Sequence, residues 1–144
     1  MIMEKKFELT DKFIINVFGI KLFQIKCTKS FKYAQKGDLG GYVEKEGNLG
    51  QENDAWVSGN AQVYGDANIK NNNEHCGFDG FGSCNRHTHA YLTKEKKVEI
   101  TCGCFRGSIE EFEKKVEETH SGTIYEKQYK AIINVIKIKF GLTD

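Results

Sequence analysis

Two histidines and two cysteines flank a short stretch of the chain whose pattern is typical of a β-hairpin. His87 and His89 precede this stretch, and Cys102 and Cys104 follow it. If the turn falls at residues 94–97, His89 faces Cys102 and His87 faces Cys104. Because side chains alternate along a strand, all four would project from one face of the hairpin. Imidazole and thiolate groups are ligands that zinc takes in tetrahedral sites, so this pattern predicts a bound Zn2+ ion.

Further side chains of the same types lie just upstream and widen the set of candidate ligands. Cys84 and Cys76 are possible substitutes for a hairpin ligand, and His75 lies beside Cys76. The spacing differs from the usual zinc-finger pattern, so a reduced cluster without metal and a disulfide remain as alternatives. The chain has five cysteines, an odd number that argues against a full disulfide framework. Cys27 is remote from the others, and we expect it to be a packed core thiol.

The composition is that of an ordinary soluble chain without a strong electric field. The chain has 144 residues, of which 39% are hydrophobic and 28% charged, and its formal net charge is +1. It has no apolar run long enough to span a bilayer and no secretory pattern at its N-terminus, so we expect a cytoplasmic protein without a membrane partner. Thiols stay reduced in that compartment, which favours metal binding over a disulfide. The near-neutral charge gives no reason to expect direct nucleic-acid binding.

The elements expected along the chain define an α+β protein in two parts, residues 1–74 and 75–144. The first part opens with an N-terminal β-hairpin formed by residues 13–18 and 21–27, which are rich in β-branched and aromatic side chains. A hexapeptide pattern, Ala-x-aliphatic-x-Gly-Asn/Asp, then begins at Ala55 and at two later positions. A hexapeptide period predicts a short parallel β-coil, and an ordinary meander is the alternative.

The second part is predicted to be a zinc-pinned β-hairpin followed by two amphipathic helices. Ser108 and Glu111 have the spacing of a capping box, which starts the first helix, and Ser121-Gly122 ends it. The last helix is marked by apolar side chains at helical spacing and by a glycine after them. These apolar residues are Tyr125, Tyr129, Ile132, Ile133, Ile136 and Phe140, followed by Gly141.

Several of these motifs together resemble one group of proteins. The motifs are Gly82-Ser83-x-Asn85, the run Cys102-Gly103-Cys104-Phe105-Arg106-Gly107-Ser108-Ile109-Glu110-Glu111-Phe112, Thr119-His120, and the final helix rich in lysine and tyrosine. The combination resembles a C-terminal module of uncharacterised phage and prophage proteins. Those proteins often carry an upstream stretch like residues 37–46 and similar hexapeptide repeats, so the resemblance covers most of residues 37–140. The chain departs from that pattern at Cys84, His87 and His89, where those proteins carry arginine and threonine side chains.

The resemblance implies a function in phage biology rather than a catalytic activity. Small phage proteins of this kind often inhibit a host defence system, and anti-CRISPR proteins are one such class. We therefore expect a non-enzymatic, zinc-stabilised protein that binds a bacterial defence protein stoichiometrically, with a CRISPR effector nuclease as the first candidate. Trp56 and Tyr64, expected to be exposed, and the acidic helix face are the predicted contact surfaces. That face carries Glu110, Glu113, Glu117 and Glu118; an ordinary solvated helix face is its alternative interpretation.

Two other classes of function compete with this expectation. A zinc-dependent hydrolase would need a general base near the metal, but Glu99 alternates onto the opposite face of the expected hairpin. The sequence also lacks a deaminase pattern. A small nucleic-acid-binding module would use the lysine-rich last helix, and the near-neutral net charge argues against strong phosphate binding.

Overall fold

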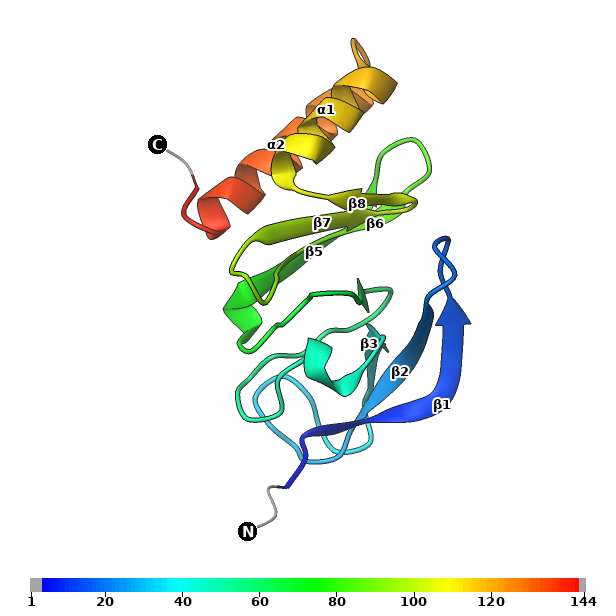
Figure 1. The fold of residues 1–144 in the computed structure, drawn as a ribbon, viewed down its shortest axis with the longest axis vertical. Coiled ribbons are helices and arrows are strands. Elements are labelled where there is room, and N and C mark those ends of the chain that lie inside the picture. The colour runs from blue at the N-terminus through cyan, green and yellow to red at the C-terminus, as the bar shows by residue number, and fades with distance from the viewer. Residues whose placement is uncertain (1–3, 143–144) are drawn as a thin grey trace. The chain divides into compact units, whose positions relative to one another are not determined.

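The computed structural model of the protein describes residues 4–142. The chain divides after His75 into two compact units. Each unit has a four-stranded sheet, and two α-helices belong to the second unit (Figure 1). The protein is therefore an α+β protein. Within residues 4–142, neither helix has the length and the apolar character that a membrane-spanning segment requires.

The first unit is built around a sheet with the strand order β1-β2-β3-β4. Strands β1, β2 and β3 pair antiparallel, and β4 pairs parallel to β3. Two short 3-10 helices, η1 and η2, lie in the connections. The elements are β1 (Phe7–Ile15), β2 (Lys21–Cys27), β3 (Leu39–Val43), η1 (Glu46–Asn48), β4 (Gln62–Val63) and η2 (Asn72–Glu74). The thiol of Cys27 is buried in this unit, which confirms that prediction.

The segment with the hexapeptide pattern stacks parallel on the chain that precedes it. Val43 pairs with Val63, and Leu49 forms a parallel bridge with Ile69, at the same separation along the sequence. All four aliphatic side chains are buried. The side chain of Asn48 is buried as well, and it donates hydrogen bonds to backbone carbonyls at 3.2 and 2.9 Å. The alternating aliphatic residues of the repeat thus form a core, and the enclosed amide is paired.

The second unit has the strand order β5-β6-β7-β8, and both helices lie against one face of this sheet (Figure 1). The neighbours β6 and β7 pair antiparallel, as do β7 and β8. Gly77 and Gly80 lie within β5, and Gly82 follows its end. The elements are β5 (His75–Phe81), β6 (Arg86–Leu92), β7 (Val98–Cys102), β8 (Phe105–Gly107), α1 (Ile109–His120) and α2 (Ile124–Lys139).

Both ends of α1 and the C-terminal end of α2 lie where the sequence predicts. The Ser108 hydroxyl accepts a hydrogen bond from the Glu111 backbone N–H at 3.1 Å, and the Glu111 carboxylate accepts one from the Ser108 N–H at 2.9 Å. This reciprocal pair is the predicted capping box. After α1, Ser121 is the C-cap residue, and Gly141 follows α2 with a φ of 70°. The predicted helix boundaries are therefore confirmed.

The helices bury their apolar stripes against one side of β6 and β7. The strands contribute Ala90, Ile100 and Cys102 to this core. The helices contribute Ile109, Phe112, Val116, Tyr129, Ile132, Ile133 and Ile136. Because neighbouring side chains on a strand point to opposite faces, the residues between these strand positions project from the other side of the sheet. This alternation decides where each predicted metal ligand lies.

Candidate functional site

The predicted register of the β6–β7 hairpin is wrong by one residue. The structure pairs His89 with Thr101 and Thr88 with Cys102. The Thr93 N–H donates to the Lys97 carbonyl at 2.9 Å, so three residues form the loop instead of the expected four. Lys96 takes a left-handed conformation with a φ of 64°, as in the usual three-residue hairpin loop. When the pairing of two strands shifts by one residue, side chains that were predicted to share a face of the sheet project from opposite faces.

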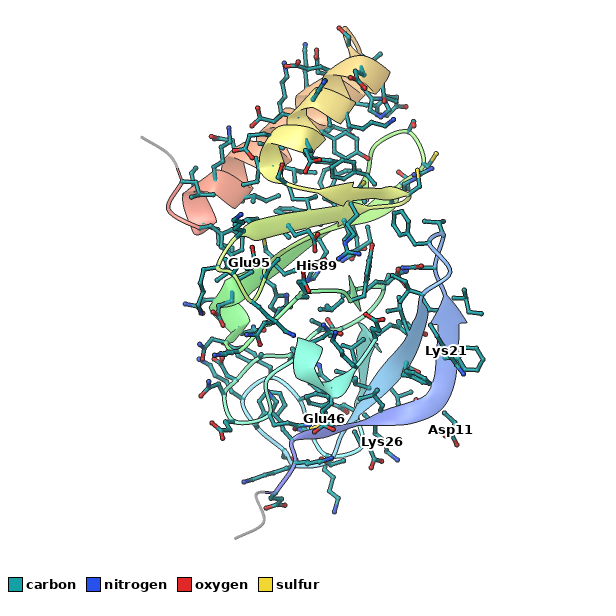
Figure 2. All side chains as sticks on the ribbon, viewed as in Figure 1. Asp11, Lys21, Lys26, Glu46, His89 and Glu95 are labelled. Atoms are coloured by element: carbon teal, nitrogen blue, oxygen red, sulfur yellow. The ribbon has the colours of Figure 1, made fainter. Side chains whose placement is uncertain are left out.

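This register separates the predicted ligands into two groups. His87 and His89 project from the face of the sheet that points away from the helices, and Figure 2 labels His89 there. Cys102 projects from the helix face, and Cys104 lies in the turn between β7 and β8. The four side chains therefore do not fit one tetrahedral zinc site. Among residues 4–142, no group of three or more potential metal ligands is assembled. This geometry does not test zinc binding as such, which stays a prediction.

The two histidines form a hydrogen-bonded chain with an aspartate that the sequence did not single out. His87 Nδ1 lies 2.6 Å from an Asp79 carboxylate oxygen, and His87 Nε2 lies 2.9 Å from His89 Nδ1. When both rings are neutral, the tautomer that suits this chain has His87 donating to Asp79 and His89 donating to His87. Gly77 allows this arrangement, because a Cβ atom there would lie 2.7 Å from the His87 ring.

The cysteine on the helix face is part of a different network. The Thr88 hydroxyl donates to Cys102 Sγ at 3.2 Å, and the Tyr129 hydroxyl lies 3.6 Å from the same sulfur. Burial, and next the hydrogen bond with Cys102, raise the pKa of Tyr129. Cys76, one of the substitute ligands, packs against the helix-side core, and burial raises the pKa of its thiol. It is not among the residues that line the cavity described next.

A cavity of about 260 Å³ opens beside Cys102, between the end of the sheet and the two helices. Its lining combines three thiols, two cationic side chains and four rings. The lining residues are Ser83, Cys84, Arg86, Cys102, Cys104, Phe105, Phe112, Lys115, Val116, Thr119, His120 and Tyr129. No carboxylate is among them. The cavity therefore combines an apolar wall with two positive charges, which suits a ligand that has an apolar body and an anionic group.

The guanidinium of Arg86 lies beside the exposed thiols of this cavity. Its Nη2 atom donates to Cys84 Sγ at 3.8 Å, and its positive charge also interacts with Cys104. Cys84 follows Ser83 in the β5–β6 turn, and the Ser83 hydroxyl lies 3.9 Å from its sulfur. The hydrogen bond with Ser83, followed by the hydrogen bond from Arg86 and the charge of Arg86, lowers the pKa of Cys84. The thiolate form of Cys84 is thereby favoured, as expected for a thiol beside a guanidinium.

Two glycines make room for the side chains that shape the cavity. Gly82 has a φ of 82°, and a Cβ atom there would clash with the Tyr129 hydroxyl. Gly103 has a φ of 59°, and a Cβ atom there would clash with the Arg86 guanidinium. Both positions need the left-handed conformation and the missing side chain of glycine. The two turns are therefore built around Tyr129 and Arg86.

The aromatic wall of the cavity is a continuous series of ring contacts that joins both helices. The rings of Phe105 and Phe112 lie 5.0 Å apart, and those of Phe112 and Tyr129 lie 5.5 Å apart in an edge-on contact. His120, the last residue of α1, stacks on Tyr129 at 5.6 Å. Such ring pairs prefer these geometries, so the wall is a fixed surface. The helical spacing of the apolar residues predicts that Phe112 and Tyr129 lie in the helix core, which the structure confirms, but it does not predict the cavity beside them.

The prediction that Trp56 and Tyr64 are exposed is wrong. Trp56 is 8% exposed and Tyr64 is 2% exposed. The Trp56 ring contacts Phe31 edge-on at 5.7 Å and lies over Gly40, whose missing side chain leaves room for it. Tyr64 contacts the ring of Phe18 at 6.4 Å. The chain around the repeat is covered on both sides, so alternation there does not separate a core side from a solvent side.

The acidic face of α1 is partly neutralised by lysines of α2. Glu113 forms an ion pair with Lys137 at 2.6 Å, and Glu117 lies 3.9 Å from Lys130. Glu110 is exposed, and its charge contributes to the raised pKa of Lys137. Paired carboxylates present less net negative charge than a row of free ones. A role for Glu110, Glu113 and Glu117 in partner binding stays a prediction.

Comparisons of the chain with protein-family models, with curated proteins and with solved structures find no match.

Proposed function

We propose that this protein acts by binding another protein stoichiometrically and that the cavity beside Arg86 is its main contact site. The partner would insert a segment in which an acidic side chain adjoins an apolar one. The observation that carries this proposal is the charge of the lining, which includes Arg86 and Lys115 but no carboxylate. An anionic group that enters the cavity meets two cations beside an apolar wall, where the local dielectric strengthens their attraction.

The identity of the partner rests on the resemblance to phage and prophage proteins. On that basis we propose a bacterial defence protein, with a CRISPR effector nuclease as the first candidate, and action in the cytoplasm of the bacterial host. The cavity supports this proposal because an inhibitor needs a preformed surface, and the packed rings of the cavity wall provide one. Part of the module that carries the resemblance, from Gly82 to Asn85 and from Cys102 to Phe105, forms the turns around the cavity.

We also propose that residues 37–73 form a single turn of a hexapeptide β-coil. The parallel pairs of Val43 with Val63 and of Leu49 with Ile69 support this interpretation, because stacked coils pair parallel and in register. A coil of this length buries the aliphatic side chains of the repeat but cannot cover its own two ends. Its part in the proposed function is structural.

Two adjacent lysines on α1 offer a matched test of the contact site. Lys115 lines the cavity and Lys114 does not, although both are exposed on the same helix. The experiment titrates a purified CRISPR effector nuclease with the protein and measures target cleavage. We expect inhibition to saturate at a stoichiometric ratio, to weaken strongly with Lys115→Glu and to persist with Lys114→Glu.

Four results would contradict this proposal. Undiminished cleavage at a large excess of the protein would reject the proposed nuclease as partner. Equal inhibition by the Lys114→Glu and Lys115→Glu variants would reject the cavity as the contact site. Multiple-turnover loss of the nuclease or of a small substrate would reveal an enzyme. Inhibition that disappears on adding free DNA or RNA, with direct binding of that nucleic acid at the cavity, would point to nucleic acid as the ligand instead.

A further inference from the structure

We propose that Cys84 and Cys104 form a redox pair, which a peroxide converts into a disulfide that alters the Arg86 cavity. The formation of this disulfide involves this protein alone and does not depend on any binding partner. Its effect on partner binding rests on the proposed function above.

The position of the two thiols carries the inference. Cys84 lies in the turn that leads into β6, and Cys104 lies in the turn that leaves β7. The β6–β7 pairing ends with Thr88 and Cys102, so both turns leave the ladder at the same end of the two strands. Both thiols are exposed, both line the same cavity together with Arg86, and Cys84 accepts a hydrogen bond from the Arg86 guanidinium. The fold thus brings two exposed thiols that are 20 residues apart in the sequence to one cavity.

The remaining cysteines are poorly placed to compete. Cys102 lines the same cavity but is only 7% exposed, and its sulfur accepts a hydrogen bond from Thr88 at 3.2 Å. Cys76 packs against the helix-side core at the start of β5. Cys27 belongs to the other unit and is 1% exposed. Since oxidation of thiols follows their exposure, Cys84 and Cys104 are the expected pair.

The chemistry needs a peroxide as the oxidant and no other reactant. The sulfur of Cys84 attacks one peroxide oxygen, which breaks the O–O bond, gives a sulfenic acid and releases water. The sulfur of Cys104 then attacks the sulfenic sulfur, an S–S bond forms, and the hydroxyl leaves as a second water molecule. Two thiols are oxidised and one hydrogen peroxide is reduced to two water molecules. A dithiol reductant reverses the bond by thiol–disulfide exchange.

The bond must also change the cavity. In a disulfide the two sulfur atoms are about 2 Å apart, so the side chains of Cys84 and Cys104 must meet beside Arg86. The guanidinium then loses the Cys84 thiol as its acceptor, and we expect it to move from its place near Gly103. Because Arg86 is one of the two cations of the lining, we expect the oxidised protein to bind an anionic partner several-fold more weakly.

The test is oxidation of the intact protein with hydrogen peroxide, followed by intact mass and peptide mapping under non-reducing conditions. We expect a loss of two hydrogen atoms, a crosslinked peptide pair that contains Cys84 and Cys104, and recovery with dithiothreitol. Cys84→Ser and Cys104→Ser should each abolish the crosslink, whereas Cys76→Ser should keep it. Thermal unfolding of the reduced variants, compared with the wild type, shows that each one is folded.

The outcomes separate this inference from the proposed function. A mapped disulfide with another cysteine, or oxidation of Cys84 to sulfinic acid without a crosslink, would overturn the redox pair and leave the Lys115 test untouched. Equal inhibition of the nuclease by the reduced and the crosslinked protein would overturn the proposed effect on the cavity. Loss of the Lys115 dependence would reject the contact site while the mapped disulfide still stood.

Discussion

Thr88, and not His89, lies opposite Cys102 in the β6–β7 hairpin, with its hydroxyl 3.2 Å from the sulfur. This one pair determines which side chains can act together. It places Cys102 with Tyr129 on the helix side of the sheet and leaves His87 and His89 in a chain with Asp79 on the other side. The chemistry of the second unit is therefore divided between a thiol-lined cavity and a separate histidine chain.

The register of the β6–β7 hairpin predicts which residues cannot bind the same metal ion. Because His89 and Cys102 project from opposite faces, we expect no zinc ion to be held jointly by His87, His89, Cys102 and Cys104. Elemental analysis of protein purified without added metal, compared with a Cys102→Ser, Cys104→Ser double variant, checks this expectation. A result of about one zinc per chain in the wild type, with the zinc lost in that variant and also in His87→Ala, would instead support the four-ligand site.

Gly82 should tolerate alanine much less well than Gly80. Both glycines have a φ above 80°, so alanine at either position costs about 1–2 kcal/mol of backbone strain. A Cβ atom at Gly80 meets open space, whereas one at Gly82 would clash with the Tyr129 hydroxyl. We expect Gly82→Ala to cost about 1–3 kcal/mol more than Gly80→Ala, measured by urea unfolding.

The clash can be isolated with a double-mutant cycle. In the Tyr129→Phe background the hydroxyl is gone, so the extra cost of Gly82→Ala should shrink. Equal costs for the two alanine variants in the wild-type background would show that Tyr129 does not lie against this turn.

Lys6 should make the stability of the first unit depend on pH in the alkaline range. The side chain is 4% exposed, and its amino group donates to the Asn53 carbonyl at 2.8 Å and also to Ala55. Burial lowers the pKa of Lys6 from 10.5 to about 8, although the charge of Asp54 opposes this shift. Between these two values the unfolded chain binds more protons than the folded one. The free energy of unfolding should therefore rise with pH from about 8, by at most about 1.4 kcal/mol per pH unit.

Lys6→Met is the control for this pH dependence. Other groups titrate in the same range, so the quantity to measure is the difference in unfolding free energy between the wild type and Lys6→Met. That difference should shift in favour of the wild type as the pH rises from 8 toward 10. A difference that is constant over this range would show that the pKa of Lys6 is the same in both states.

The helices could be predicted from the sequence, because the capping residues and the apolar spacing that specify a helix lie within the helix itself. The Ser108–Glu111 box and the stripe of Phe112 and Val116 specify a helix whatever the rest of the chain does. The hairpin register depends instead on one backbone angle, the left-handed φ at Lys96. A lysine residue in the sequence does not indicate that conformation.

The cavity could not be predicted from spacing alone. Arg86, Lys115 and Tyr129 come from a strand and from two different helices, and only the packing of α1 and α2 on the sheet brings them together. The burial of Trp56 could not be predicted for a related reason. Alternation in the repeat predicts solvent on its side, but Phe31 and Gly40 enclose the ring there.

We propose that the cavity between Arg86 and Lys115 accepts an anionic group attached to an apolar body. The most direct measurement titrates the 15N-labelled protein with phenylacetate and follows the backbone amide signals. We predict saturable shifts confined to residues 83–86, 103–105 and the second half of α1, present in Lys114→Glu and lost in Lys115→Glu. Shifts scattered over both units, or equal shifts in the two variants, would contradict the account.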